Sequence, residues 1–151
     1  MADRSIPVRS EVPEESTWNL KDVFESDAAW QAEYEALKSV PAQLEAFRGK
    51  LGESAETLLQ WFRLNDSISV RLEKLYGYAS CKGDEDTANG FYQGMRSKAL
   101  ATLVAIDAAS AFETPEIMAL DEDTVNLFYA AQPELETYRR NIYKIRRRKA
   151  H

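Results

Sequence analysis

The 151-residue sequence holds a single cysteine, Cys81, and a single histidine, His151, which is its last residue. One cysteine cannot form a disulfide within the chain. Together the two residues cannot supply a Cys/His zinc cluster, and a Ser-His-Asp triad would lack an ordered histidine. The scarcity of these residue types therefore excludes the commonest zinc and nucleophile sites.

Glycine and proline are also scarce, with six and five residues respectively, which argues against a β-sandwich rich in tight turns. No apolar run approaches the roughly 20 residues that span a bilayer. The N-terminus has no hydrophobic signal-peptide core, and a lone unpaired cysteine fits a reducing compartment. We therefore expect a cytoplasmic protein that does not bind membranes.

Positive charge is in the minority, because 25 acidic residues outnumber 19 basic residues and the net charge is −6. Phosphates repel such a surface, so we expect no general binding of nucleic acid. Hydrophobic residues nevertheless make up 44% of the sequence, which is enough to bury a core. The length fits one domain, or two very small ones.

What the sequence does have is helical periodicity. Residues 54–82 form the clearest predicted helix, with Ser54 as the N-cap and apolar side chains that recur every three or four residues. Its seam consists of Leu58, Trp61, Asn65, Ile68, Leu72, Leu75 and Ala79. Asn65, the one polar member, either fixes the register of helix packing or contacts a ligand.

A second long helix is predicted over residues 86–112. Its apolar side consists of Phe91, Met95, Ala99, Thr102, Ile106 and Ala109. Residues 99–106 are almost all apolar or small, which predicts burial on more than one face. These two helices should form a hairpin.

Residues 82–86 are expected to form the tight turn of this hairpin, with Gly83 ending the first helix and one of the aspartates capping the second. The calcium-loop spacing is absent, so we interpret these carboxylates as caps rather than as a cation site. Tyr76 and Tyr78 lie close by in the sequence. They either pack at the helix end or line a pocket.

Shorter helices complete the chain. Ser26 or Asp27 should cap one of them, and Pro41 should break it near Val40. Further helices are predicted to start near residues 114, 121 and 133, and no strand pattern occurs. The fold class is therefore all-α, an antiparallel helical bundle built on the long hairpin. We divide it into an N-terminal arm with a short helix (residues 1–25) and a helical domain (residues 26–151).

Two segments keep alternative interpretations. Trp18 and Phe24 are expected to pin the arm to the helical domain. The basic end, residues 146–149, complements a helix dipole. The alternative interpretation is a tail that binds phosphate or RNA.

No glycine-rich phosphate loop, paired-cysteine motif or nucleotide fingerprint occurs. We therefore assign no catalytic, cofactor-binding or metal-binding residue to this chain.

An ordered set of short segments resembles the N-terminal region of oligoendopeptidase F-like zinc metallopeptidases, the thimet oligopeptidase type. The segments are Arg9–Leu20, Ser26–Trp30, Phe47–Leu51, Leu75–Ala79, Asp84–Thr87, Ala111–Ile117 and Tyr138–His151. They cover residues 9–151 in order and with sensible spacing.

This resemblance implies a mostly helical metalloendopeptidase, a hydrolase that acts in proteolysis of short peptides. The family's zinc ligands, on a histidine-glutamate-x-x-histidine helix, and its catalytic glutamate lie far downstream of this region, so none is carried over. The chain then looks like an N-terminal fragment that should be inactive alone. It would have a structural role and would restrict the access of substrates. Its partner would be the missing catalytic domain of the same protein, which would hold the zinc.

The alternative interpretation is a free-standing helical adaptor, or protein-interaction module, without enzymatic activity. A downstream zinc-binding helix in the gene would favour the peptidase, whereas a stop codon after His151 would favour the adaptor. As a fragment, the chain would expose apolar surface from residues 99–106 and 126–143 and could self-associate.

Overall fold

The computed structural model describes residues 9–147. Three short 3-10 helices come first, η1 (Arg9–Glu11), η2 (Glu14–Ser16) and η3 (Leu20–Asp22). The α-helices are α1 (Asp27–Leu37), α2 (Val40–Glu45), α3 (Ala55–Glu85), α4 (Gly90–Ser110), α5 (Glu113–Ala119), α6 (Glu122–Ala131) and α7 (Arg139–Arg147), with the 3-10 helix η4 (Pro133–Tyr138) before α7. The described residues contain no strand, so the predicted all-α class is confirmed.

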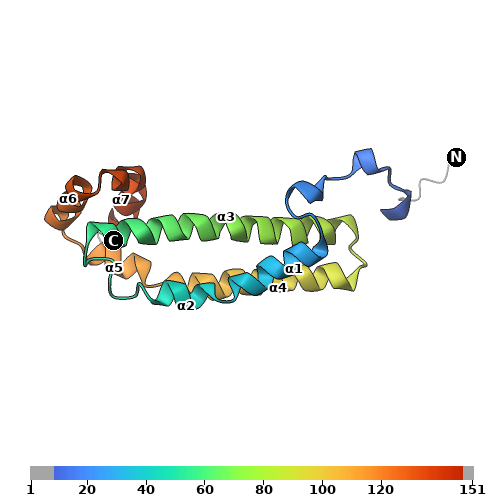
Figure 1. Ribbon diagram of the computed structural model, residues 1–151, viewed down its shortest axis with the longest axis horizontal. Helices are drawn as coiled ribbons and strands as arrows, with labels where there is room; N and C mark the ends of the chain where they lie inside the picture. The colour runs from blue at the N-terminus through green and yellow to red at the C-terminus, as the bar shows by residue number, and fades with distance from the viewer. Residues whose placement is uncertain (1–8, 148–151) are drawn as a thin grey trace.

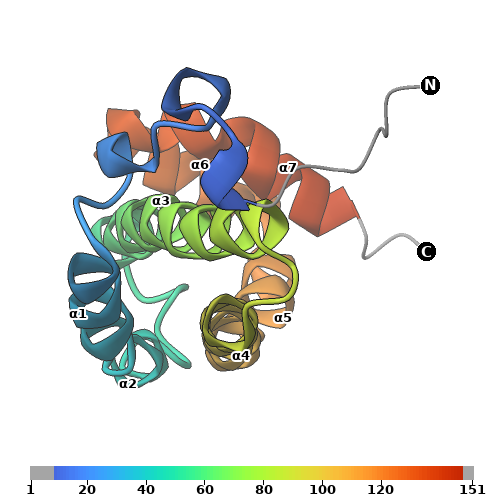
Figure 2. The same ribbon diagram turned by 90° about the vertical axis from the view of Figure 1, so that its right-hand side faces the viewer.

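The long helices α3 and α4 run antiparallel and form the axis of an elongated molecule (Figure 1). Helices α1 and α2 contact α4 along its length, and α1 also contacts α3. Helices α5 to α7 gather near the start of α3, at the opposite end of the hairpin from the N-terminal arm (Figure 1). Viewed along the hairpin, α1 and α2 lie on one side of α4 and α5 on the other (Figure 2). None of the described helices is long and apolar enough to cross a membrane.

The start of α3 follows the sequence prediction. The Ser54 side chain accepts a hydrogen bond from the Thr57 N–H at 3.0 Å, which satisfies a free donor of the first turn. The buried members of the predicted seam are Leu58, Trp61, Ile68, Leu75 and Ala79. Leu72, by contrast, is only partly buried at the edge of the core.

The predicted turn at residues 82–86 is wrong, because α3 continues as a helix through Gly83 to Glu85. The Gly83 carbonyl accepts a hydrogen bond from the Gln93 side chain at 3.3 Å, and a Cβ on Gly83 would lie 3.4 Å from that amide nitrogen. That distance is an ordinary van der Waals contact with the end of a flexible side chain, so Gly83 is an interior residue of α3 and does not end it. Asn89, not an aspartate, caps α4 by accepting from the Phe91 N–H at 3.0 Å.

The inner side of α4 also follows the prediction, except at its start. Its buried residues are Met95, Ala99, Thr102, Ile106 and Ala109. Phe91 is 62% exposed, and Leu100 and Val104 are 51% and 59% exposed. The expectation that residues 99–106 are buried on more than one face is therefore wrong for this chain, because no described helix covers the outer side.

The break at Pro41 is confirmed. Helix α1 ends at Leu37 and α2 begins at Val40, with the proline in the first turn, where its missing N–H costs no hydrogen bond. Ser26 caps α1 by accepting from the Ala29 N–H at 3.2 Å. The two short helices can therefore bend around the hairpin and bury Trp30, Leu37, Val40 and Leu44.

Candidate functional site: a cleft under the N-terminal arm

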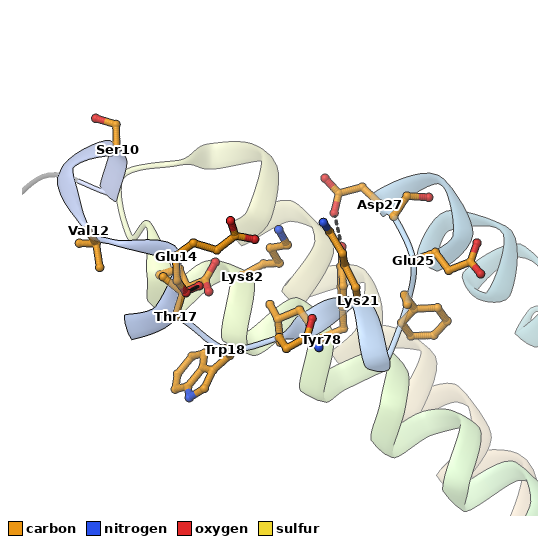
Figure 3. A pocket seen from close by; sticks show the side chains of 15 residues that line it. Ser10, Val12, Glu14, Thr17, Trp18, Lys21, Glu25, Asp27, Tyr78 and Lys82 are labelled. Atoms are coloured by element: carbon orange, nitrogen blue, oxygen red, sulfur yellow. Dashed lines mark hydrogen bonds between the residues drawn. The ribbon is translucent and has the colours of Figure 1, made fainter.

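A cleft of about 700 Å³ lies between the N-terminal arm, the start of α1 and the last turns of α3 (Figure 3). The arm contributes Ser10, Val12, Glu14, Thr17, Trp18, Asn19, Leu20, Lys21, Phe24 and Glu25, and the α1 cap Ser26 follows them. The helices contribute Asp27, Tyr78, Lys82 and Glu85. We call this hollow the arm cleft.

The arm is held by its last few residues. Leu20, Val23 and Phe24 pack against the core, and the Phe24 ring meets the Tyr78 ring edge to face, with centroids 5.5 Å apart. The expected pinning of the arm is therefore confirmed for Phe24. It is wrong for Trp18, which is 58% exposed and points away from Lys21 and Asp27 (Figure 3).

A partly buried hydrogen-bond cluster lies at one wall of the arm cleft, which Asp27 and Tyr78 line. The Tyr78 hydroxyl donates to Asp27 Oδ1 at 2.7 Å and the Tyr92 hydroxyl donates to Asp27 Oδ2 at 3.5 Å. Burial, and then the Asp27 carboxylate, raise the pKa of both tyrosines above its ordinary value. Both phenols therefore remain neutral donors and keep the carboxylate in place.

Cations lie beside this cluster. The Lys82 ammonium is 5.7 Å from the centroid of the Tyr78 ring and 5.4 Å from that of Tyr92, a distance at which ring faces attract cations. Lys21 lies on the arm side of the same cleft (Figure 3). With the nearby carboxylates of Glu14 and Glu25, these groups can bind a polar or charged chain.

Cys81 directly precedes the cleft residue Lys82 on α3. Burial, with Asp84 and Glu85, raises the pKa of the neighbouring Cys81, which keeps it a thiol rather than a reactive thiolate. Within residues 9–147, no group of three or more His, Cys, Asp or Glu side chains could hold a metal ion.

The two tyrosines singled out in the sequence have separate environments. Tyr78 lines the arm cleft, whereas the neighbouring Ser80 and Arg96 side chains lower the pKa of Tyr76. Sequence reasoning missed the pairing of Tyr78 and Tyr92 with Asp27. These residues are 51 and 65 positions apart from it, so no local pattern could have revealed it.

The basic end is only partly described. Arg146 pairs with Glu122 at 2.6 Å and Arg139 pairs with Glu136 at 2.5 Å, so both guanidinium groups already have carboxylate partners. Residues 148–151, on which the phosphate- or RNA-binding hypothesis also depended, lie outside the described residues.

Comparison with known proteins gives consistent matches. A family model described as oligopeptidase F matches residues 116–151. The oligopeptidase PepF of Bacillus subtilis is 38% identical over 146 residues, which are 97% of this chain and 22% of that protein. A plasmid-encoded oligoendopeptidase F of Lactococcus lactis is 36% identical over 144 residues, which are 95% of this chain and 24% of that protein.

Solved structures agree with these matches. The crystal structure of oligoendopeptidase F from Enterococcus faecium superposes with a TM-score of 0.72 at 29% identity, covering 83% of this chain and 25% of the other. A crystal structure from Chlamydophila abortus superposes with a TM-score of 0.84 at 24% identity, which shows a shared fold. The chain thus spans about a quarter of the length of the relatives it matches.

Proposed function

Because this chain is the N-terminal region of an oligoendopeptidase F-like protein, we propose that it is the structural and substrate-access domain of a zinc-dependent oligopeptidase. One observation carries the proposal. Nearly the whole chain aligns with the relatives, yet it covers only 22% to 24% of their length. The catalytic part would then lie in the remaining three quarters, roughly, of such a polypeptide.

The composition of the chain supports this division of labour. A catalytic zinc site uses about three protein ligands and an open position for water. This sequence has one histidine and one cysteine, and its described residues offer no group that fits a metal. Zinc in the downstream region would activate water for attack on a peptide carbonyl. The residues of this chain would bind and position peptides, and we propose a cytoplasmic location.

The arm cleft is the part of the chain best suited to restricting access. Its ammonium groups, carboxylates and aromatic rings can contact the charged and apolar groups of an extended peptide. The long hairpin of α3 and α4 supports the cleft from below. We also propose the boundary between arm and helical domain near residue 25, since α1 begins at Asp27 after the Ser26 cap.

Two lysines provide a matched test in the protein expressed from the whole gene. Lys82→Ala changes the arm cleft, whereas Lys74→Ala changes an exposed position of the same helix outside it. Hydrolysis of quenched peptides of increasing length should show an altered length preference for Lys82→Ala alone, with zinc content unchanged. Identical length preferences for the two variants would overturn the access role.

A further inference from the structure

The outer side of α4 is apolar along its central turns. Leu100 and Val104 are 51% and 59% exposed, and Ala101, Ala105 and Ala108 are exposed between and beyond them. Asp107 is the one charged residue from position 99 to position 109. We call the surface formed by residues 100, 101, 104, 105 and 108 the α4 apolar face.

The exposed side of α3, the other helix of the hairpin, is polar and provides a comparison for α4. From residue 63 to residue 74, the exposed charged side chains of α3 are Arg63, Asp66, Glu73 and Lys74. Val70 stands alone among them with 53% exposure. Single exposed apolar residues are normal, whereas a continuous apolar helix face marks an interaction surface.

A groove continues this face toward α1 and α2. It has a volume of about 220 Å³, and its lining includes Tyr34, Leu37, Pro41, Ala101 and Ala105. The two alanines belong to both the groove and the α4 apolar face. Because the separation of packed helix axes depends on the side chains at the contact, these small residues would let another helix come close.

We propose that the α4 apolar face and its groove dock a helix from the catalytic part of the same polypeptide. This inference rests on the proposed function, in which the relatives' remaining length, about three quarters, lies outside the matched region. The occupant would present large apolar side chains to the alanines. A second copy fits less well, because each copy carries a net charge of −6, which opposes self-association.

Thiol labelling of two exposed valines tests the docking. Val104→Cys places a thiol on the α4 apolar face, and Val70→Cys places one on the polar side of α3 at similar exposure. Both are made with Cys81→Ser, in the 151-residue chain and in the protein expressed from the whole gene. The rate of reaction with a maleimide reagent is measured for all four proteins under dilute conditions.

Both thiols should react rapidly in the 151-residue chain. In the whole protein, reaction at position 104 should slow at least about tenfold, a free-energy difference of roughly 1.4 kcal/mol in protection, and position 70 should stay reactive. Equal reactivity of the two positions in the whole protein would overturn the proposal. So would protection of position 104 that grows with concentration in the 151-residue chain, because it would assign the surface to a second copy. Peptide hydrolysis is not read in this experiment, so failure of the docking and failure of the peptidase function are distinguishable.

Discussion

The indole N–H of Trp30 donates a hydrogen bond of 2.7 Å to the backbone carbonyl of Leu75, 45 residues further along the chain. Both residues are fully buried, and the Tyr34 ring stacks on Trp30 with centroids 5.7 Å apart. This contact fixes α1 against the middle of the long helix α3. It thereby sets where the start of α1, and with it Asp27, meets the arm cleft.

Replacing the indole should destabilise the fold. Trp30→Phe removes the buried donor and part of the packed ring, so we expect a loss of about 1–3 kcal/mol or more in the free energy of unfolding. Trp18→Phe is the control, because its ring is 58% exposed, and it should change stability by less than about 0.5 kcal/mol. Urea denaturation measures both, and equal losses would contradict the assigned role of Trp30.

Truncating Leu72 or Leu75, two of the three leucines of the α3 seam, should destabilise the fold by different amounts. Leu75 is fully buried whereas Leu72 lies at the edge of the core. Leu75→Ala should therefore cost roughly 2–5 kcal/mol, the range for a core leucine, and Leu72→Ala should cost clearly less. Denaturant titration of the two variants checks the order, and a larger loss for Leu72→Ala would shift the register of the seam.

Glu113 should make stability depend on pH. Burial raises the pKa of its carboxyl, and the nearby Trp61 indole offsets part of that rise. A raised pKa in the folded state gives stability that is present below the unfolded pKa, about 4.3, and is lost as pH rises through the folded pKa. The free energy of unfolding of Glu113→Gln, relative to that of the native chain, should therefore increase as the pH rises from about 4 to about 7. Thermal unfolding at both pH values tests this, and a constant or reversed difference would contradict it.

Exposed apolar surface should bind a hydrophobic dye. If the α4 apolar face is the main site, Val104→Asp lowers the dye fluorescence of the 151-residue chain at least twofold, roughly, because a charge interrupts the patch. Val70→Asp, on the polar side of α3, should leave the fluorescence nearly unchanged. Absence of dye binding to the native chain, or the same drop in both variants, would contradict this account of the face.

The sequence predicted the two long helices and the caps at Ser26 and Ser54, because periodicity and capping are local signals. Ser26, Ser54 and the break at Pro41 all depend on residues within one helical turn. The prediction that Gly83 ends the helix is wrong, because α3 runs on to Glu85 and the Gly83 carbonyl accepts a hydrogen bond from Gln93 on another helix. Glycine inside a helix has no local signal that separates packing from termination.

The exposed side of α4 and the arm cleft show a second limit. An apolar run such as residues 99–106 indicates that a helix has partners, but not whether they belong to the same chain. The arm cleft depends on side chains 51 and 65 residues from Asp27. Only the folded arrangement brings these groups together, so the Asp27 cluster could not have been predicted from spacing.

Peptide hydrolysis tests the central claim most directly. An internally quenched oligopeptide is incubated with the 151-residue chain and with the protein expressed from the whole gene, each with and without a zinc chelator. We expect no chelator-sensitive cleavage by the 151-residue chain and zinc-dependent cleavage by the whole protein. Chelator-sensitive turnover by the pure 151-residue chain, or a whole protein that lacks it, would contradict a division between an N-terminal access domain and a downstream catalytic domain.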